Sequence, residues 1–178
     1  MIKLIDVHKW IKNRQSSSID FDCNIEEINN YLFERLNKTV PLDNERMILA
    51  ADDKKIYGFV SMSVDSIKFV AVERASYPVL KVNAIGIDKN YQNSGFGTQL
   101  LLSCYRLALN LNDVVPIDGI YLVALRDAIE FYEKFDLKNL NAPPEWVMNQ
   151  QEFQMGIQIS VIQKLGLLPY SNPEELKG

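Results

Sequence analysis

The strongest constraint on the fold is a stretch in which an extended apolar segment runs directly into a loop and then into a long helix. Residues 78–87 are rich in Val, Leu and Ile, as strands are. From about Gly95 to Asn110 the chain is apolar nearly all round a helix. A helix of that kind has to be buried, so we expect it to pack against a sheet that contains residues 78–87.

The rest of the pattern supplies further strands and helices. Asn24 with Glu27 three residues on is a capping-box pattern, and Asp127 with Glu130 repeats it. Strands are expected at residues 2–5, 47–51, 56–64, 118–124 and 155–161. The order predicts the α/β class (mixed α+β), with a central mixed, mostly antiparallel sheet flanked by helices.

Composition indicates one globular domain. The chain has 178 residues, 47% of them hydrophobic and 24% charged, with no break that would separate two domains. We therefore expect a single domain over residues 1–170 and a solvated tail over residues 171–178. With one histidine, His8, and two cysteines without a partner at metal spacing, neither a metal site nor a histidine-based triad is expected.

Two features bear on the location of the chain and on charged partners. The start MIKLIDVHKW turns polar too early for a signal peptide, and no apolar run reaches the roughly 20 residues of a membrane span. Together with two unpaired thiols this favours the cytoplasm and no membrane partner. The net charge of −4 and the acidic balance count against nucleic-acid binding driven by charge alone.

The loop between the predicted strand and helix carries the chemical signal. It reads Gln92-Asn93-Ser94-Gly95-Phe96-Gly97-Thr98. A helix N-terminus leaves N–H groups unpaired and suits a phosphate, and glycines let the backbone approach it closely. No lysine follows Gly97 as a Walker loop requires, and Leu100 stands where a dinucleotide fingerprint has its third glycine. A plain turn without a ligand remains open.

Two motifs give a family resemblance. The loop, with its approach Ile85-Gly86-Ile87-Asp88-Lys89-Asn90-Tyr91-Gln92, resembles the acyl-coenzyme A loop of the GNAT acetyltransferase superfamily. The segment Ala128-Ile129-Glu130-Phe131-Tyr132-Glu133-Lys134-Phe135-Asp136-Leu137 resembles a second helix of that family. Asp136 and Leu137 depart from its usual glycine and phenylalanine. The two motifs cover residues 78–140, and the order of elements extends the match to most of the chain.

The resemblance implies a role for each motif residue. Acetyl-coenzyme A would be the acyl donor, and no metal would take part. Ile85, Gly86 and Ile87 would hydrogen-bond the pantetheine arm through their main chain, and an amide there would stabilise the developing oxyanion. Tyr132 would protonate the departing thiolate. The alternative for Tyr132 is a core aromatic residue at helical spacing. The backbone amides of Ser94, Gly95, Phe96, Gly97 and Thr98 would bind the pyrophosphate. Gln92 would fix the loop or contact the phosphate itself, and Asn93 belongs to the same cofactor-binding loop.

The general base is left open by the sequence. An amine with a pKa near 10 has to lose a proton before it attacks. Glu73 and His8 are candidates, although each is better explained as a solvated surface group. The base would otherwise be water, or the amine would arrive neutral.

The opening residues resemble a particular branch of the superfamily. Phe21-Asp22-Cys23 and Ile28-Asn29-Asn30-Tyr31-Leu32 are similar to the start of toxin-like GNAT enzymes, which acetylate aminoacyl-tRNA and pair with an antitoxin. Asn24 and Ala84 depart from that branch. Three hypotheses follow: an N-acetyltransferase acting on a primary amine by direct transfer, a toxin acting on aminoacyl-tRNA, and a non-catalytic acyl-coenzyme A-binding module. A homodimer fits any of them.

Overall fold

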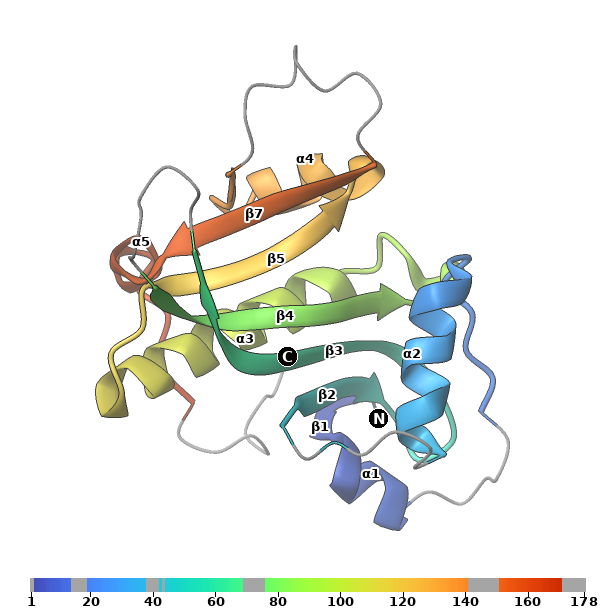
Figure 1. The fold of residues 1–178 in the computed structure, drawn as a ribbon. Helices are drawn as coiled ribbons and strands as arrows, with labels where there is room; N and C mark the ends of the chain where they lie inside the picture. Colours follow the sequence, from blue (N-terminus) through green and yellow to red (C-terminus); the bar gives the residue numbers. More distant parts are fainter. Residues whose placement is uncertain are drawn as a thin grey trace. The chain divides into compact units, whose positions relative to one another are not determined.

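The computed structural model describes residues 2–13, 19–37, 42, 44–68, 76–140 and 151–170 (Figure 1). Its seven strands form one sheet in the order β1-β2-β3-β4-β5-β7-β6. The pairs β1–β2, β2–β3, β5–β7 and β6–β7 are antiparallel, and β4–β5 is parallel. This confirms the mixed, mostly antiparallel sheet. The strands are β1 (Lys3–Asp6), β2 (Arg46–Ala51), β3 (Ile56–Ile67), β4 (Tyr77–Ile87), β5 (Gly119–Leu125), β6 (Lys138–Asn139) and β7 (Glu152–Gln158).

Helices lie between some of these strands, and the chain divides into two compact units. Unit 1 comprises Met1–Ser63, Asn83–Cys104 and Tyr170–Gly178, and unit 2 comprises Val64–Val82 and Tyr105–Pro169. The chain passes between the units inside β3, β4 and α3. The helices are α1 (Val7–Asn13), α2 (Glu26–Leu36), η1 (Lys89–Tyr91), α3 (Phe96–Val114), η2 (Arg126–Ala128), α4 (Ile129–Glu133) and α5 (Ile159–Lys164).

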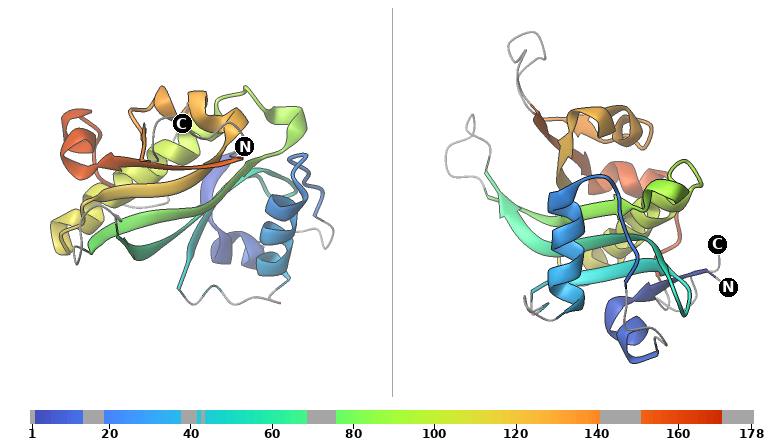
Figure 2. Two further views of the ribbon diagram at one scale, coloured as in Figure 1. Left: turned by 45° about the horizontal axis from the view of Figure 1, so that its top comes forward. Right: turned by 90° about the vertical axis from the view of Figure 1, so that its right-hand side faces the viewer.

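In unit 1, helices cover both faces of the strands (Figure 2). The apolar face of α2 places Leu32 and Leu36 against Leu49 and Phe59 of the sheet, as its helical spacing predicts. On the other face, a Cβ added to Gly58 would lie 3.1 Å from the side chain of Leu100, at the start of α3. The strands of unit 1 are therefore held between α2 and the first half of α3.

A buried ion pair ties α2 to the sheet in unit 1. Arg35 is 9% exposed and donates two hydrogen bonds of 2.9 Å to the carboxylate of Glu45. Tyr31 and Ser61 donate to the same carboxylate at 2.5 and 2.9 Å. The hydrogen bonds from Arg35, opposed by burial, lower the pKa of Glu45 from 4.5 to about 2. Four donors on one carboxylate satisfy charges that would be costly to bury alone.

Unit 2 contains β5 and β7 with the second half of α3, α4 and α5. The hydroxyl of Tyr105, on α3, donates to the carbonyl of Phe135 just after α4 at 2.6 Å. Position 119 requires glycine, because a Cβ there would collide with the carbonyl oxygen of Ile157 on the neighbouring strand. The start of β5 is thus fixed by its close backbone approach to β7.

Several predicted boundaries are wrong for physical reasons. Asn24 adopts a positive φ of 67° and does not cap α2, whose N-cap is Ile25 without a side-chain hydrogen bond. Asp127 lies inside the 3₁₀ turn η2, and α4 starts after Ala128. The closing strand ends at Gln158, because residues from Ile159 onward turn into α5.

The helix α1 is among the elements that the sequence did not predict. α1 follows β1 without a break and buries Val7 and Trp10. Its sequence signal is Asp6, whose carboxylate accepts the N–H of His8 at 2.9 Å as an N-cap does. The expected tail over residues 171–178 lies outside the described residues.

We predict that Arg35→Met lowers the free energy of unfolding by about 3 kcal/mol at pH 7, because Glu45 would stay half-buried without its partner. Arg46→Met is the control, since Arg46 is 42% exposed and lies 3.8 Å from Asp6. It should cost less than about 1 kcal/mol. Urea denaturation followed by circular dichroism measures both, and equal losses would contradict the prediction.

The same pair predicts a pH dependence. The folded pKa of Glu45, about 2, lies below its ordinary 4.5, so the stabilisation is complete above about pH 4.5 and is lost as the pH falls toward 2. Wild type should therefore lose more stability than Arg35→Met over that interval.

Candidate functional site

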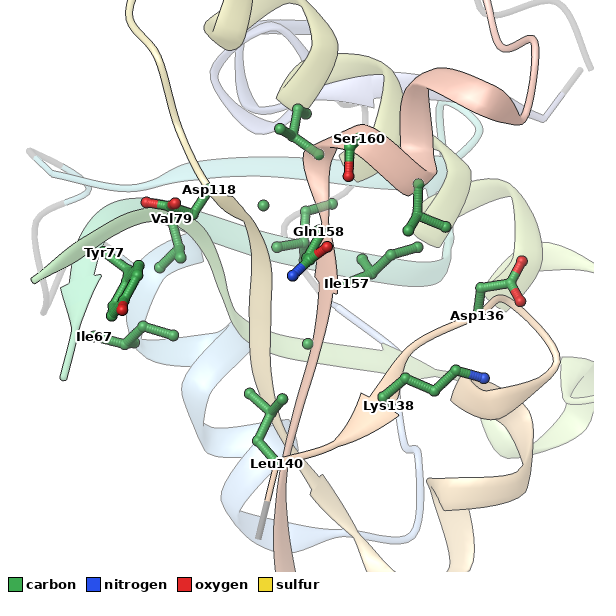
Figure 3. Close-up of a pocket in the computed structure, with 15 residues that line it drawn as sticks. Ile67, Tyr77, Val79, Asp118, Asp136, Lys138, Leu140, Ile157, Gln158 and Ser160 are labelled. Atoms are coloured by element: carbon green, nitrogen blue, oxygen red, sulfur yellow. The ribbon is translucent and has the colours of Figure 1, made fainter. Parts of the chain in front are cut away.

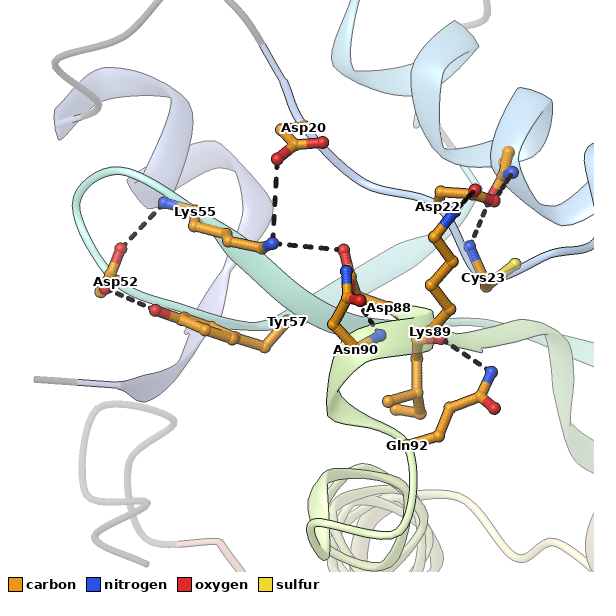
Figure 4. Close-up of polar contacts among 12 residues, drawn as sticks. Asp20, Asp22, Cys23, Asp52, Lys55, Tyr57, Asp88, Lys89, Asn90 and Gln92 are labelled. Atoms are coloured by element: carbon orange, nitrogen blue, oxygen red, sulfur yellow. Dashed lines mark hydrogen bonds and ion pairs between the residues drawn. The ribbon is translucent and has the colours of Figure 1, made fainter.

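The end of β4 leads into the predicted loop through a buried carboxylate. Asp88 is 2% exposed, and its backbone N–H donates to the carbonyl of Tyr57 at 3.0 Å. Its side chain accepts the N–H of Asn90 at 3.0 Å and so caps η1. The ammonium of Lys55 lies 3.5 Å from the same carboxylate (Figure 4). The strand therefore stops at a defined point, and the turn after it has a defined direction.

Residues 92–98, called the glycine loop from here on, expose the N-terminus of α3. Gly95 has a φ of +86° and no heavy atom within 4 Å of a built Cβ. The first helical hydrogen bond of α3 runs from the N–H of Gln99 to the carbonyl of Gly95 at 3.1 Å. In an α-helix the N–H groups before that bond, here those of residues 96–98, have no helical carbonyl to donate to. Open space before such N–H groups suits a phosphate.

Gln92 lies at the start of the glycine loop. Its side-chain amide donates to the carbonyl of Ile87 at 3.4 Å (Figure 4). That bond links the loop back to the end of β4. Asn93 has a φ of 60°, and with Gly95 it gives the loop two left-handed residues.

Three aromatic rings bracket the glycine loop. Tyr91 comes just before the loop, and Phe96 is the first residue of α3. The ring of Tyr57 packs edge-on against Tyr91 at 4.7 Å between centroids and stacks on Phe96 at 5.6 Å. One side chain from β3 therefore contacts both the residue before the glycine loop and Phe96 within it. The sequence analysis did not single out Tyr57.

A hydrogen bond fixes that side chain in turn. The hydroxyl of Tyr57 donates to the carboxylate of Asp52 at 2.9 Å, and this bond raises the pKa of Tyr57 to about 12. Asp52 also accepts the backbone N–H groups of Lys54 and Lys55 in the β2–β3 turn. The β2–β3 turn therefore holds Tyr57 through Asp52, and Tyr57 in turn contacts the rings of Tyr91 and Phe96.

The predicted pantetheine strand is the end of β4. Gly86 is buried, and a Cβ there would meet Ile28 and Phe59 within 3 Å. Ile85 and Ile87 are half-buried on either side of it. The absence of a side chain at Gly86 lets the α2 side pack closely against this strand.

The other predicted catalytic residues are Tyr132 and the two candidates for the general base. Tyr132 lies in α4 within unit 2, is 5% exposed, and packs against the ring of Phe131 at 5.1 Å. His8 is exposed on α1. Glu73 lies outside the described residues.

Unit 2 also contains an open cavity of about 650 Å³ (Figure 3). Apolar side chains such as Ile67, Val79 and Leu140 line it, with Asp136 and Lys138 among its polar residues. None of the predicted site residues lines this cavity.

The described ranges contain neither a helix that could span a membrane nor a cluster that could bind a metal. No helix there is long and apolar enough to cross a lipid bilayer. No group of three or more His, Cys, Asp or Glu side chains in those ranges is arranged to hold a metal ion.

The sequence and fold define a class of protein. The family model described as "Acetyltransferase (GNAT) domain" matches residues 43–136, more than half of the chain. The chain belongs to this family, as the two motifs predicted. The match contains the glycine loop and Tyr132.

Particular relatives refine the resemblance. The "Probable toxin TacT" of Sinorhizobium fredii (strain NBRC 101917 / NGR234) is 27% identical over 116 residues, which cover 59% of this chain and 64% of the relative. The match thus spans less than two thirds of that protein.

Solved structures share the fold at low identity. A tyrosine-to-phenylalanine mutant of the AtaT toxin, bound to acetyl-CoA and the C-terminus of the antitoxin AtaR, has a TM-score of 0.67 and 16% identity, covering 93% of this chain and 96% of that one. AtaT complexed with acetyl-methionyl-tRNAfMet has a TM-score of 0.72 and 15% identity, with 94% and 100% coverage.

We predict that Gly95→Val abolishes coenzyme A binding. The new side chain would enter the open space before α3 and strain a φ of +86°. Gly166→Val is a matched control, because Gly166 has a φ of +69° and equally open surroundings. Both variants should lose about 1–3 kcal/mol of stability from strain. Titration calorimetry with coenzyme A should show at least a tenfold loss for Gly95→Val alone, and equal affinities in the two would refute the phosphate site.

Proposed function

We propose that this chain transfers the acetyl group of acetyl-coenzyme A directly to a primary amine. The observation that carries the proposal is the glycine loop, where a left-handed Gly95 opens the N-terminus of a long helix at the end of β4. Family membership supplies the acyl donor and the reaction class. The proposal treats residues 1–170 as one functional domain, because the family match contains residues of both units.

The proposed chemistry is a single displacement. The amine nitrogen attacks the thioester carbonyl, the carbon–sulfur bond breaks, and the amide forms with loss of one proton from nitrogen. The N–H groups of residues 96–98 bind the pyrophosphate, while the main chain of residues 85–87 binds the pantetheine arm and stabilises the oxyanion. Tyr132 donates a proton to the departing thiolate, and solvent restores it.

We propose that the acceptor is the amino group of an aminoacyl-tRNA. The relative named as a toxin and the AtaT complex with acetyl-methionyl-tRNAfMet support this acceptor. The chemistry supports it too, since an α-amine has a pKa of about 7.7–8.0 and is partly neutral at pH 7. Such an amine needs no strong general base, whereas a lysine or polyamine does. His8 is exposed on α1, and we propose that water is the proton acceptor.

This acceptor implies partners and a location. The AtaT structure contains part of an antitoxin, so we propose that an antitoxin also binds this chain. The substrates acetyl-coenzyme A and charged tRNA place the activity in the cytoplasm. The net charge of −4 means that tRNA binding would depend on a local surface, not on the overall charge.

We predict thiol release when the protein is mixed with acetyl-coenzyme A and methionyl-tRNA. Free amino acids, spermidine and a lysine peptide at equal concentration form the comparison panel. The aminoacyl-tRNA should react at least tenfold faster than any other amine. Turnover confined to spermidine or the peptide would refute the tRNA acceptor, and coenzyme A binding without turnover on any amine would favour the non-catalytic module.

We predict that Tyr132→Phe lowers kcat about 100-fold and changes the KM for acetyl-coenzyme A much less, because only the proton donor is removed. Tyr105→Phe is the control: Tyr105 is fully buried in the same unit and donates to a carbonyl. Its loss should cost about 1 kcal/mol of stability and leave kcat unchanged. Wild-type turnover by Tyr132→Phe, when chemistry limits the rate, would assign this ring to the core alone.

A further inference from the structure

Asp22 is a hydrogen-bond hub just before α2. One carboxylate oxygen accepts the N–H of Asn24 at 2.8 Å and the side-chain amide of Asn29 at 2.9 Å. The side-chain oxygen of Asn29 also accepts the backbone N–H of Cys23 at 2.9 Å. These three bonds hold the left-handed turn at Asn24 against the first turn of α2.

The other side of the hub is Lys89, the first residue of η1. Its ammonium donates to the second carboxylate oxygen of Asp22 at 2.7 Å, and its backbone N–H donates to the carbonyl of Asp22 at 2.8 Å (Figure 4). Lys89 lies 67 positions along the chain from Asp22 and three before Gln92, where the glycine loop begins. Side chain and backbone of one residue therefore fasten the start of the loop to the start of α2.

A second contact joins the same two segments. The ammonium of Lys55 lies 3.9 Å from the carboxylate of Asp20 and 3.5 Å from that of Asp88. Asp20 and Asp22 precede α2, while Asp88 and Lys89 precede the glycine loop. Two lysines, Lys55 and Lys89, thus pair with three aspartates, and these contacts hold the segment before α2 beside the segment before the glycine loop.

The energetics separate this arrangement from a stabilising core contact. The side chains of Asp22 and Lys89 are 42% and 46% exposed. Exposed ion pairs contribute little to folding, so the pair should matter less for stability than for position. The hydrogen bond from Lys89 lowers the pKa of Asp22 to about 2, so the carboxylate stays charged at neutral pH.

We propose that Asp22 and Lys89 are a positioning pair that holds the glycine loop in register with the first turn of α2, so that coenzyme A binding and the order of that turn are coupled. The coenzyme A part rests on the proposed function. The pair does not touch the reacting atoms. It acts on the donor through the glycine loop, and it also contacts α2, whose segment is the one that resembles the toxin-like branch.

The test compares Lys89→Met with Lys81→Met. Lys81 forms an exposed ion pair with Asp65 at 3.3 Å, with exposures of 36% and 46%, and lies on β4 within unit 2. It is therefore a matched pair of the same chemistry away from the glycine loop. Asp22→Asn, the double variant and the conservative Lys89→Arg complete the set.

Two readouts are needed. Hydrogen exchange of the unliganded protein should be faster in Lys89→Met at both residues 23–29 and residues 92–95, and unchanged there in Lys81→Met. Coenzyme A Kd from calorimetry should rise about fivefold in Lys89→Met and in Asp22→Asn, with no further rise in the double variant and recovery in Lys89→Arg. Melting temperatures should stay within about 3 °C of wild type.

The failures are distinguishable. If wild type binds coenzyme A and Lys89→Met binds it as tightly as Lys81→Met does, the positioning pair is refuted and the proposed function stands. Faster exchange at residues 92–95 without any change at residues 23–29 would also refute the coupling. If wild type does not bind coenzyme A, the proposed function and this inference fail together.

Discussion

The buried carboxylate of Asp88 is the interaction on which the candidate site depends. It lies where β4 ends and caps η1 by accepting the N–H of Asn90. The ammonium of Lys55 lies 3.5 Å from the same carboxylate. A one-residue shift of β4 would turn the Asp88 side chain to the other face of the sheet, because side chains alternate along a strand. The glycine loop and the start of α3 take their direction from this point. The ring of Tyr57 then stacks on Phe96 and so holds the second half of the glycine loop.

The proposed phosphate site in the glycine loop is compatible with an acidic chain. Residues 92–98 contain no charged side chain. In the proposed site, the attraction for phosphate would come from backbone N–H groups and the helix dipole, which the fold orients and which lose no side-chain entropy on binding. The net charge of −4 is therefore no obstacle at this point of the surface. Recognition of the donor and overall electrostatics are separate matters in this protein.

The sequence predicted the parts of the fold that depend on local pattern. The strand at residues 78–87, the long helix after it and the hairpin around residues 52–55 are confirmed, since each has a clear apolar period and a turn signal. The predicted caps at Asn24 and Asp127 are wrong, because tertiary hydrogen bonds and a 3₁₀ turn displaced the helix starts. Within the site, the glycines could be found from their spacing. Tyr57 contacts Phe96, and Lys55 contacts Asp88, only because the strands bring distant parts of the chain together. No local pattern carries that information.

The route of the chain through its two units has a consequence for how such a protein can be divided. Three of the passages between the units fall inside β3, β4 and α3, and not in linkers. A cut at any of them would interrupt a hydrogen-bonded ladder or a helix. Neither unit can therefore be obtained as a contiguous fragment, and recombination that swaps one unit for a homologous piece would need several simultaneous crossovers. Variation in this architecture is more readily acquired in the loops, by insertion, than by exchange of modules.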